Sequence, residues 1–174
     1  LTSITVDINN ANYSSEDGVL FNKAKTNLIQ YPPRKTDTSY TIPSSVTTIE
    51  KNGFYKSVGL TSVTIPNSVI EIGNRAFKDC RSLKEVNIPQ EVTSIGAEAF
   101  QYCEELMSIE LPTGITVMED GTFYHCLALK EIKLPRGLTK IGRSAFSGCE
   151  NLVAVDLPQT VTVIGDWAFF ECVK

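Results

Sequence analysis

The sequence lacks the residues that most enzyme classes need for their chemistry. There is a single histidine, His125, so neither a Ser-His-Asp nor a Cys-His arrangement has support. No glycine-rich phosphate loop and no zinc-hydrolase motif occurs. We therefore expect no enzymatic activity, no cofactor and no metal.

Long apolar runs and an excess of positive charge are also missing. No apolar stretch reaches the length that crosses a bilayer. The chain carries 16 basic and 20 acidic residues, a net charge of −4, which argues against nucleic acid as a partner. No leader peptide is recognisable, because residues 1–6 already alternate like a strand. This does not indicate a cytoplasmic protein, since the sequence can be a processed chain or a piece of a longer one.

What the sequence does contain is a repeat of 23 residues. Three residue types keep this period along most of the chain. They are the cysteines (Cys80, Cys103, Cys126, Cys149, Cys172), the phenylalanines (Phe54, Phe77, Phe100, Phe123, Phe146, Phe169) and six prolines (Pro43, Pro66, Pro89, Pro112, Pro135, Pro158). The period divides the chain into a first part, 1–36, and six units at 37–59, 60–82, 83–105, 106–128, 129–151 and 152–174. We expect one continuous solenoid.

The shared pattern is L-x-x-[VI]-x-[IL]-P-x-x-[VIL]-x-x-[IM]-G-x-x-A-F-x-x-C-x-x. Alternation over Val63-x-Ile65 predicts a short strand with one buried face, which the proline ends because it has no N–H to donate. A second short extended piece follows, and glycine marks the turn out of it. Phe77 and Cys80 stand three apart, which suits one inward-facing turn of α- or 3₁₀-helix. Coils this small bury a core only when they stack.

The pattern closely resembles the BspA-like leucine-rich repeats, whose signature is I-x-I-P-x-x-V-x-x-I-G-x-x-A-F-x-x-C. The resemblance covers 37–174, although unit 37–59 is degraded and unit 106–128 has Met118, Glu119 and Thr122 in place of Ile, Gly and Ala. It implies an α/β repeat solenoid, a right-handed leucine-rich-repeat superhelix with short parallel strands and helical turns. It also implies a secreted or surface-anchored protein of a host-associated bacterium or protozoan, from a family associated with adhesion to host matrix proteins and other microbes.

The first 36 residues combine the start of a repeat with an insertion. Leu1, Ile4 and Val6 resemble the opening of another unit. Residues 18–22 and 27–31 form two short apolar segments joined by Lys-Ala-Lys-Thr, which predicts a β-hairpin. The oxygen-rich stretch around Asp7–Asn12 lacks the glycine and the spacing of an EF-hand loop, so we expect no calcium site there.

The side chains two and four positions after each leading leucine should point away from the core. They run from small polar residues (Ser39, Thr41, Ser62, Thr64) to a charged stretch. The candidate binding residues are Glu85, Asn87, Glu110, Glu131, Lys133 and Asp156. One interpretation is a shallow acidic docking surface for a basic or polar partner, and the other is a solvated sheet face that keeps the protein soluble.

The remaining repeated positions have simpler interpretations. Five cysteines in equivalent slots offer no natural disulfide pairs and do not converge as zinc ligands would, so we expect small buried apolar side chains. His125 has Asp79, Tyr102, Gly148 and Glu171 as repeat equivalents, which indicates an exposed position. A threonine row (Thr47, Thr93, Thr116, Thr139, Thr162) should support the stack. The aromatics Tyr55, Tyr102, Tyr124, Trp167 and Phe170 are either interface anchors or covers of neighbouring coils.

Two functions from different classes follow from these features. The first is a non-catalytic surface recognition module, which binds extracellular proteins or glycans of a host matrix or a microbial surface. The second is a passive spacer that projects another domain from the cell surface. In either case we expect a membrane link only through an anchor outside this chain. Because neither end carries a polar cap, we also expect the chain to be a fragment of a longer repeat protein.

Overall fold

The computed structural model describes residues 1–174 as a stack of coils that carries fourteen short strands and no helix. One side of the stack bears the three-residue strands β4 (Ser39–Thr41), β6 (Ser62–Thr64), β8 (Glu85–Asn87), β10 (Ser108–Glu110) and β12 (Glu131–Lys133). A second side bears the two-residue strands β5 (Thr48–Ile49), β7 (Glu71–Ile72), β9 (Ser94–Ile95), β11 (Val117–Met118), β13 (Lys140–Ile141) and β14 (Val163–Ile164). We number the coils 1 to 6 after the six units of the sequence. No segment has the length and apolarity of a membrane-crossing helix.

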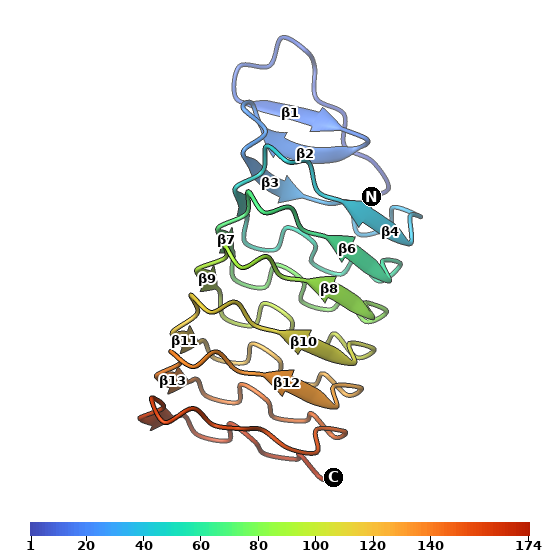
Figure 1. Cartoon of the computed structure of the whole chain (residues 1–174). Coiled ribbons are helices and arrows are strands. Elements are labelled where there is room, and N and C mark those ends of the chain that lie inside the picture. Colours follow the sequence, from blue (N-terminus) through green and yellow to red (C-terminus); the bar gives the residue numbers. More distant parts are fainter.

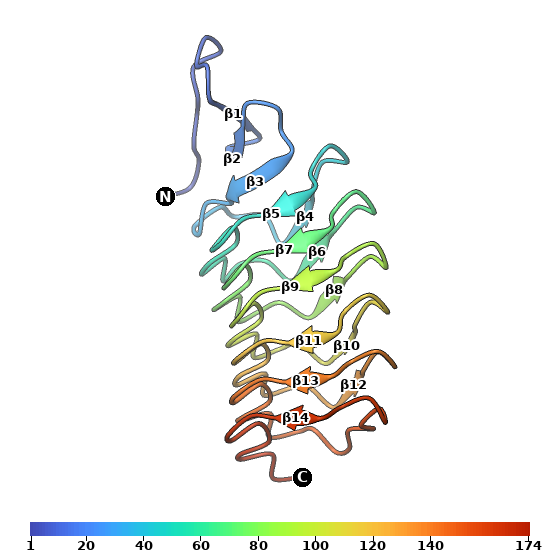
Figure 2. The same ribbon diagram turned by 90° about the vertical axis from the view of Figure 1, so that its left-hand side faces the viewer.

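Within each row, strands 23 residues apart pair in parallel, except that β8 does not pair with β10 and β9 does not pair with β11. Val63, for example, pairs with Tyr40 on one side and Val86 on the other. The strands of each row therefore lie one above the other along the stack, as Figures 1 and 2 show from two directions. Within each three-residue strand the central residue points inward while its neighbours point outward, as at Val63 between Ser62 and Thr64. The expected short parallel strands are thus confirmed.

The expected α- or 3₁₀-helical turn is wrong, and so is the assignment to the α/β class. Phe77 and Cys80 do point inward and are fully buried. However, Arg75 and Asp79 adopt left-handed φ angles of 58° and 60°, which interrupt a right-handed helix twice. Alternate N–H groups of the turn then donate hydrogen bonds to a neighbouring coil. Ala76 donates to Gly73 within its own coil, whereas Phe77 donates to Ala99 of the next coil. The turns are consecutive reversals held by stacking, and the fold is a β-solenoid.

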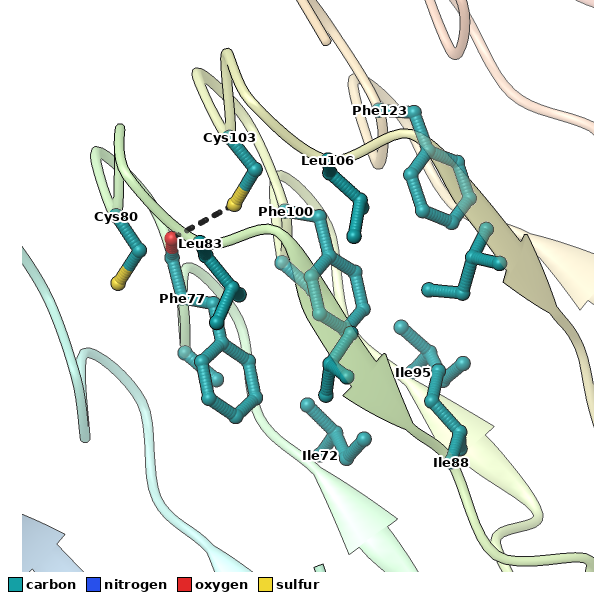
Figure 3. Packing of buried hydrophobic residues seen from close by; sticks show 14 of the residues in the cluster. Ile72, Phe77, Cys80, Leu83, Ile88, Ile95, Phe100, Cys103, Leu106 and Phe123 are labelled. Atoms are coloured by element: carbon teal, nitrogen blue, oxygen red, sulfur yellow. Dashed lines mark hydrogen bonds between the residues drawn. The ribbon is translucent and has the colours of Figure 1, made fainter. Parts of the chain in front are cut away.

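The core lies inside the coils and is continuous from end to end. It contains 40 buried apolar residues, with no break between coils. A phenylalanine ladder runs through it, and the centroids of Phe77 and Phe100 lie 5.2 Å apart with the rings 3° from parallel. Figure 3 shows Phe77, Phe100 and Phe123 side by side, with Ile72 and Ile95 beyond their ring ends. Offset-stacked rings at this separation add stability beyond their burial.

The N-terminal insertion forms a three-stranded antiparallel meander at one end of the stack. The predicted hairpin is present as β2 (Val19–Asn22) and β3 (Asn27–Gln30), and β1 (Tyr13–Glu16) adds a strand that was not predicted. β3 then pairs in parallel with β5, so the meander extends the second row of strands. Residues 1–12 form no strand, and Ile4 donates from its N–H to the carbonyl oxygen of Gly18.

Candidate binding site on the strand face

The outward side chains of the longer strands form the candidate site. Glu85 and Asn87 flank the buried Val86 on β8, and Glu131 and Lys133 flank Ile132 on β12. Their exposure follows from the alternation of the strand, which turns every second side chain toward solvent. Glu110, at the end of β10, and Asp156, on coil 6, are exposed in the same way. The structure therefore places all six candidate residues on one exposed face.

Four of these six residues line a common groove. It has a volume of about 570 Å³ and is lined by Ser108, Ile109, Glu110, Glu131, Ile132, Lys133, Leu134, Ala154 and Asp156. The other two, Glu85 and Asn87, are not part of it, because β8 and β10 do not pair and the strand row is divided between them. We call this hollow the strand-face groove.

The charges of the strand-face groove are only partly compensated. The Lys133 ammonium lies 2.7 Å from the Glu110 carboxylate, whereas Glu131 and Asp156 have no basic group within 4.0 Å. The Glu110–Lys133 pair is well exposed, so it contributes little to folding stability. It does neutralise Glu110 locally. Glu131 and Asp156 are therefore the carboxylates of the groove that are free to attract a cationic group.

The repeated cysteines have a second role that the repeat pattern did not indicate. As expected, none forms a disulfide, and Cys80, Cys103, Cys126 and Cys149 are buried. Each thiol also donates a hydrogen bond to the carbonyl oxygen of the phenylalanine 26 residues earlier, for example from Cys103 Sγ to Phe77 at 3.3 Å (Figure 3). Burial raises the pKa of the Cys80 thiol to about 12, and it raises the pKa of Cys149 to about 12 as well. These thiols are poor nucleophiles at neutral pH.

His125 is half-buried rather than exposed. Its ring stacks on Tyr102 at a centroid distance of 5.3 Å and meets the edge of Tyr124 at 4.5 Å. The Arg81 guanidinium also lies over the Tyr102 ring, 5.6 Å from its centroid. These aromatics thus cover neighbouring coils. Trp167 and Phe170, in contrast, are 60% and 56% exposed on coil 6.

A charged cluster lies on the side of the stack that carries the turns with left-handed residues such as Arg75 and Asp79, which we call the turn side. The repeat pattern gave no signal for this cluster. Glu98 accepts hydrogen bonds from Arg75 on coil 2 at 2.8 Å and from Lys78 at 2.6 Å. The hydrogen bonds from Arg75 lower the pKa of Glu98 to about 2, with further lowering by Lys78. The three residues come from two neighbouring coils, so the cluster ties coil 2 to coil 3 rather than forming a site of its own. No three His, Cys, Asp or Glu residues converge as metal ligands.

The threonine row supports the stack as expected. Thr139 Oγ1 donates to the carbonyl oxygen of Thr116, one coil earlier, at 2.9 Å, and Thr93 does the same toward Ile70 at 3.4 Å. These bonds add to the backbone ladder of the second strand row. Thr116 is an exception, because it makes no such bond to coil 3.

The stacked coils, the parallel strand rows and the repeated phenylalanine and cysteine ladders define a leucine-rich-repeat solenoid. The family model for the BspA type leucine-rich repeat region matches six copies, over residues 35–149 and 117–174. The chain belongs to this family. No curated protein matches the chain.

Three solved structures show the same architecture. A leucine-rich repeat protein from Eubacterium ventriosum is 34% identical, with a TM-score of 0.79, over 98% of this chain and 52% of that one. A leucine rich cell surface protein from Faecalibacterium prausnitzii is also 34% identical, with a TM-score of 0.81, over 95% of this chain and 41% of that one. A leucine-rich repeat protein of T. pallidum, 23% identical with a TM-score of 0.73 over 98% of this chain and 90% of that one, shows the fold alone. The chain thus spans about half the length of the first two.

Proposed function

We propose that this chain is a non-catalytic recognition module at the cell surface, which binds extracellular proteins or glycans of host or microbial origin through the strand-face groove. The cell-surface location is supported by the F. prausnitzii relative, which is described as a cell surface protein. A binding role fits a repeat fold that presents an open face of strands.

One observation carries this proposal: the groove combines an apolar floor with two unpaired carboxylates. Leu134 and Ala154 contribute apolar surface above the nearly buried Ile109 and Ile132. Glu131 and Asp156 contribute negative charge without a basic partner. A partner that inserts a lysine, an arginine or another cationic group would pair with these carboxylates while its aliphatic part covers the floor. We therefore expect a partner with a basic binding surface.

The test is binding of the chain to a panel of immobilised extracellular ligands, fibronectin and fibrinogen included, at low and physiological salt. We expect saturable binding that weakens as salt rises, since the attraction between exposed charges is screened. The double variant E131K/D156K should lose this binding. The matched control is E91K/E150K, which changes the net charge equally at two exposed acids outside the groove. Equal losses in both variants would show that only overall charge matters and would overturn the groove assignment.

The alternative is a passive spacer, and the continuity of the core favours it. All six coils share one apolar cluster without a break, which suits a rod that holds another domain away from a surface. A spacer binds none of the ligands in the panel although the chain is folded. The same experiment therefore separates the two functions.

A further inference from the structure

We infer that the junction between coil 3 and coil 4 is a built-in hinge, which opens on the strand side while its turn side stays closed. The observation behind this inference is a gap in the hydrogen bonds along the stack. Both strand rows are divided at this junction, between β8 and β10 in one row and between β9 and β11 in the other. No other junction divides both rows.

Three equivalent backbone hydrogen bonds are missing at this junction. At the junction of coils 4 and 5, Lys130 donates to Met107 at 2.9 Å, Thr139 to Thr116 at 2.8 Å and Gly142 to Met118 at 2.8 Å. At the junction of coils 2 and 3 the same bonds join Lys84 to Thr61, Thr93 to Ile70 and Gly96 to Ile72. Their counterparts at the junction of coils 3 and 4, from the N–H groups of Met107, Thr116 and Glu119, are absent.

The turn side of the same junction is intact. Glu98 donates from its N–H to Asp120 at 2.9 Å, Phe100 to Thr122 at 2.9 Å and Tyr102 to Tyr124 at 2.8 Å. Cys126 Sγ also donates to the carbonyl oxygen of Phe100 at 3.2 Å. On the strand sides, one exposed hydrogen bond to a side chain remains, from the N–H of Thr113 to Gln90 Oε1 at 3.1 Å. With the backbone bonded on the turn side and unbonded in both strand rows, the stack can splay at this place about the turn side as an axis, without separating the coils.

The cause lies in the residue that replaces the repeat glycine. At Gly96, an added Cβ would lie 2.5 Å from the backbone N of Asn74 in the preceding coil, and at Gly142 it would lie 2.6 Å from that of Asp120. These distances are too short for any side chain, so the coils approach this closely only where glycine stands. Coil 4 has Glu119 at the same position, and its Cβ holds the coil away from Ala97. The N–H of Glu119 then fails to reach Ile95.

Coil 1 also lacks this glycine, but there the bond is kept. Glu50 donates from its N–H to Leu28 at 2.9 Å. Leu28 belongs to the inserted meander, and the chain after β3 leads into Pro32 and Pro33 instead of a repeat turn. The close approach that demands glycine between two regular coils therefore does not arise beneath Glu50.

The test is amide hydrogen exchange of the whole chain, resolved residue by residue by NMR and corrected for intrinsic rates. We expect the N–H groups of Met107, Thr116 and Glu119 to be at least about tenfold less protected than those of Lys130, Thr139 and Gly142, because unbonded amides open without unfolding the stack. Glu119→Gly should close the junction and raise this protection. Glu119→Ala is the matched control, since it removes the charge and keeps the Cβ.

Each result decides the inference. The hinge and its cause are supported if the three amides are weakly protected, if Glu119→Gly raises their protection, and if Glu119→Ala leaves it unchanged. Equal protection at the two junctions overturns the hinge. Restoration by both variants, or by neither, overturns the assignment of the opening to the Cβ of Glu119.

Discussion

Cys103 donates its thiol hydrogen to the carbonyl oxygen of Phe77 at 3.3 Å, which joins two coils through a side chain that is fully buried. Four other cysteines repeat this relationship in the neighbouring coils. Coil 1 has Ser57 at the same position, and its hydroxyl oxygen is buried without a hydrogen-bond partner. The same slot thus holds a satisfied donor in one coil and an unsatisfied one in another.

Substitution to alanine should therefore have opposite effects in these two coils. Cys103→Ala removes packed sulfur and a weak hydrogen bond, and we expect a loss of about 1–2 kcal/mol in the free energy of unfolding. Ser57→Ala removes an unsatisfied buried hydroxyl, so we expect no loss and a gain of up to about 1 kcal/mol. Urea unfolding followed by circular dichroism measures both. A destabilised Ser57→Ala variant would mean that the hydroxyl has a partner after all.

Thiol accessibility should separate Cys172 from the other cysteines. Cys172 is only partly buried at the last coil, whereas the remaining four are buried inside the stack. Brief treatment of the folded chain with iodoacetamide at pH 8, followed by peptide mass spectrometry, should label Cys172 alone. Labelling in denaturant should reach all five. Rapid labelling of Cys126 in the folded chain would contradict the burial of the ladder.

Alanine substitution of two glycines should give changes of opposite sign. A Cβ at Gly73 would lie 2.7 Å from the backbone N of Lys51, which cannot move without disturbing coil 1. We expect Gly73→Ala to destabilise the chain by about 1–3 kcal/mol. At Gly114 the nearest atom is the Thr93 methyl carbon, at an ordinary 3.5 Å. Gly114→Ala should stabilise the chain by about 0.4–1 kcal/mol through the lower entropy of the unfolded state. Thermal unfolding of the two variants provides the comparison.

Acid should weaken the link between coils 2 and 3. The pKa of Glu98 is lowered in the folded chain to about 2, below its ordinary value of 4.5. Because the folded state binds this proton less tightly than the unfolded state, the contribution of Glu98 to stability is fully present above pH 4.5 and is lost as the pH falls toward 2. NMR titration of the Glu98 side chain checks the midpoint. In Arg75→Gln the midpoint should move up toward the ordinary value.

Lys133 should act against the binding that we propose for the strand-face groove. It neutralises Glu110 at 2.7 Å, so Lys133→Met should leave three unpaired carboxylates in place of two. We expect binding of a basic ligand to strengthen several-fold at low salt and this gain to shrink at physiological salt. Stability should change by less than about 1 kcal/mol because the pair is exposed. Weaker binding in this variant would mean that Lys133 itself contacts the ligand.

The sequence was sufficient for the coil but not for the path of its turn. Val63 and Ile65 predicted an inward-facing strand, and the period predicted its parallel neighbours. Phe77 and Cys80, three residues apart, fit a helical turn, which was the expectation, but they fit two successive reversals equally well. A distinguishing signal was present, because glycine occurs at Gly121 and Gly148, both of which adopt left-handed φ angles.

The insertion and the groove illustrate two further limits. The Asp17-Gly18 pair, with φ angles of 48° and 77°, forms the two-residue turn between β1 and β2, and Asp-Gly is a strong hairpin signal from which this strand pair could have been predicted. The groove had no such signal. Alternation predicted which side chains face outward, but the separation of Glu85 from Glu110 depends on how two particular coils meet. That information lies in contacts between coils and not in the pattern of one coil.

The left-handed turn residues determine how such a chain can begin to fold. Each coil has two of them, such as Arg75 and Asp79 in coil 2, and each non-glycine residue in this conformation costs about 1–2 kcal/mol. The alternate N–H groups of the same turn find acceptors only on the next coil. A lone coil would therefore bear the strain without the compensating bonds. The smallest productive nucleus spans at least two adjacent coils, and growth then proceeds by one coil at a time onto an existing template.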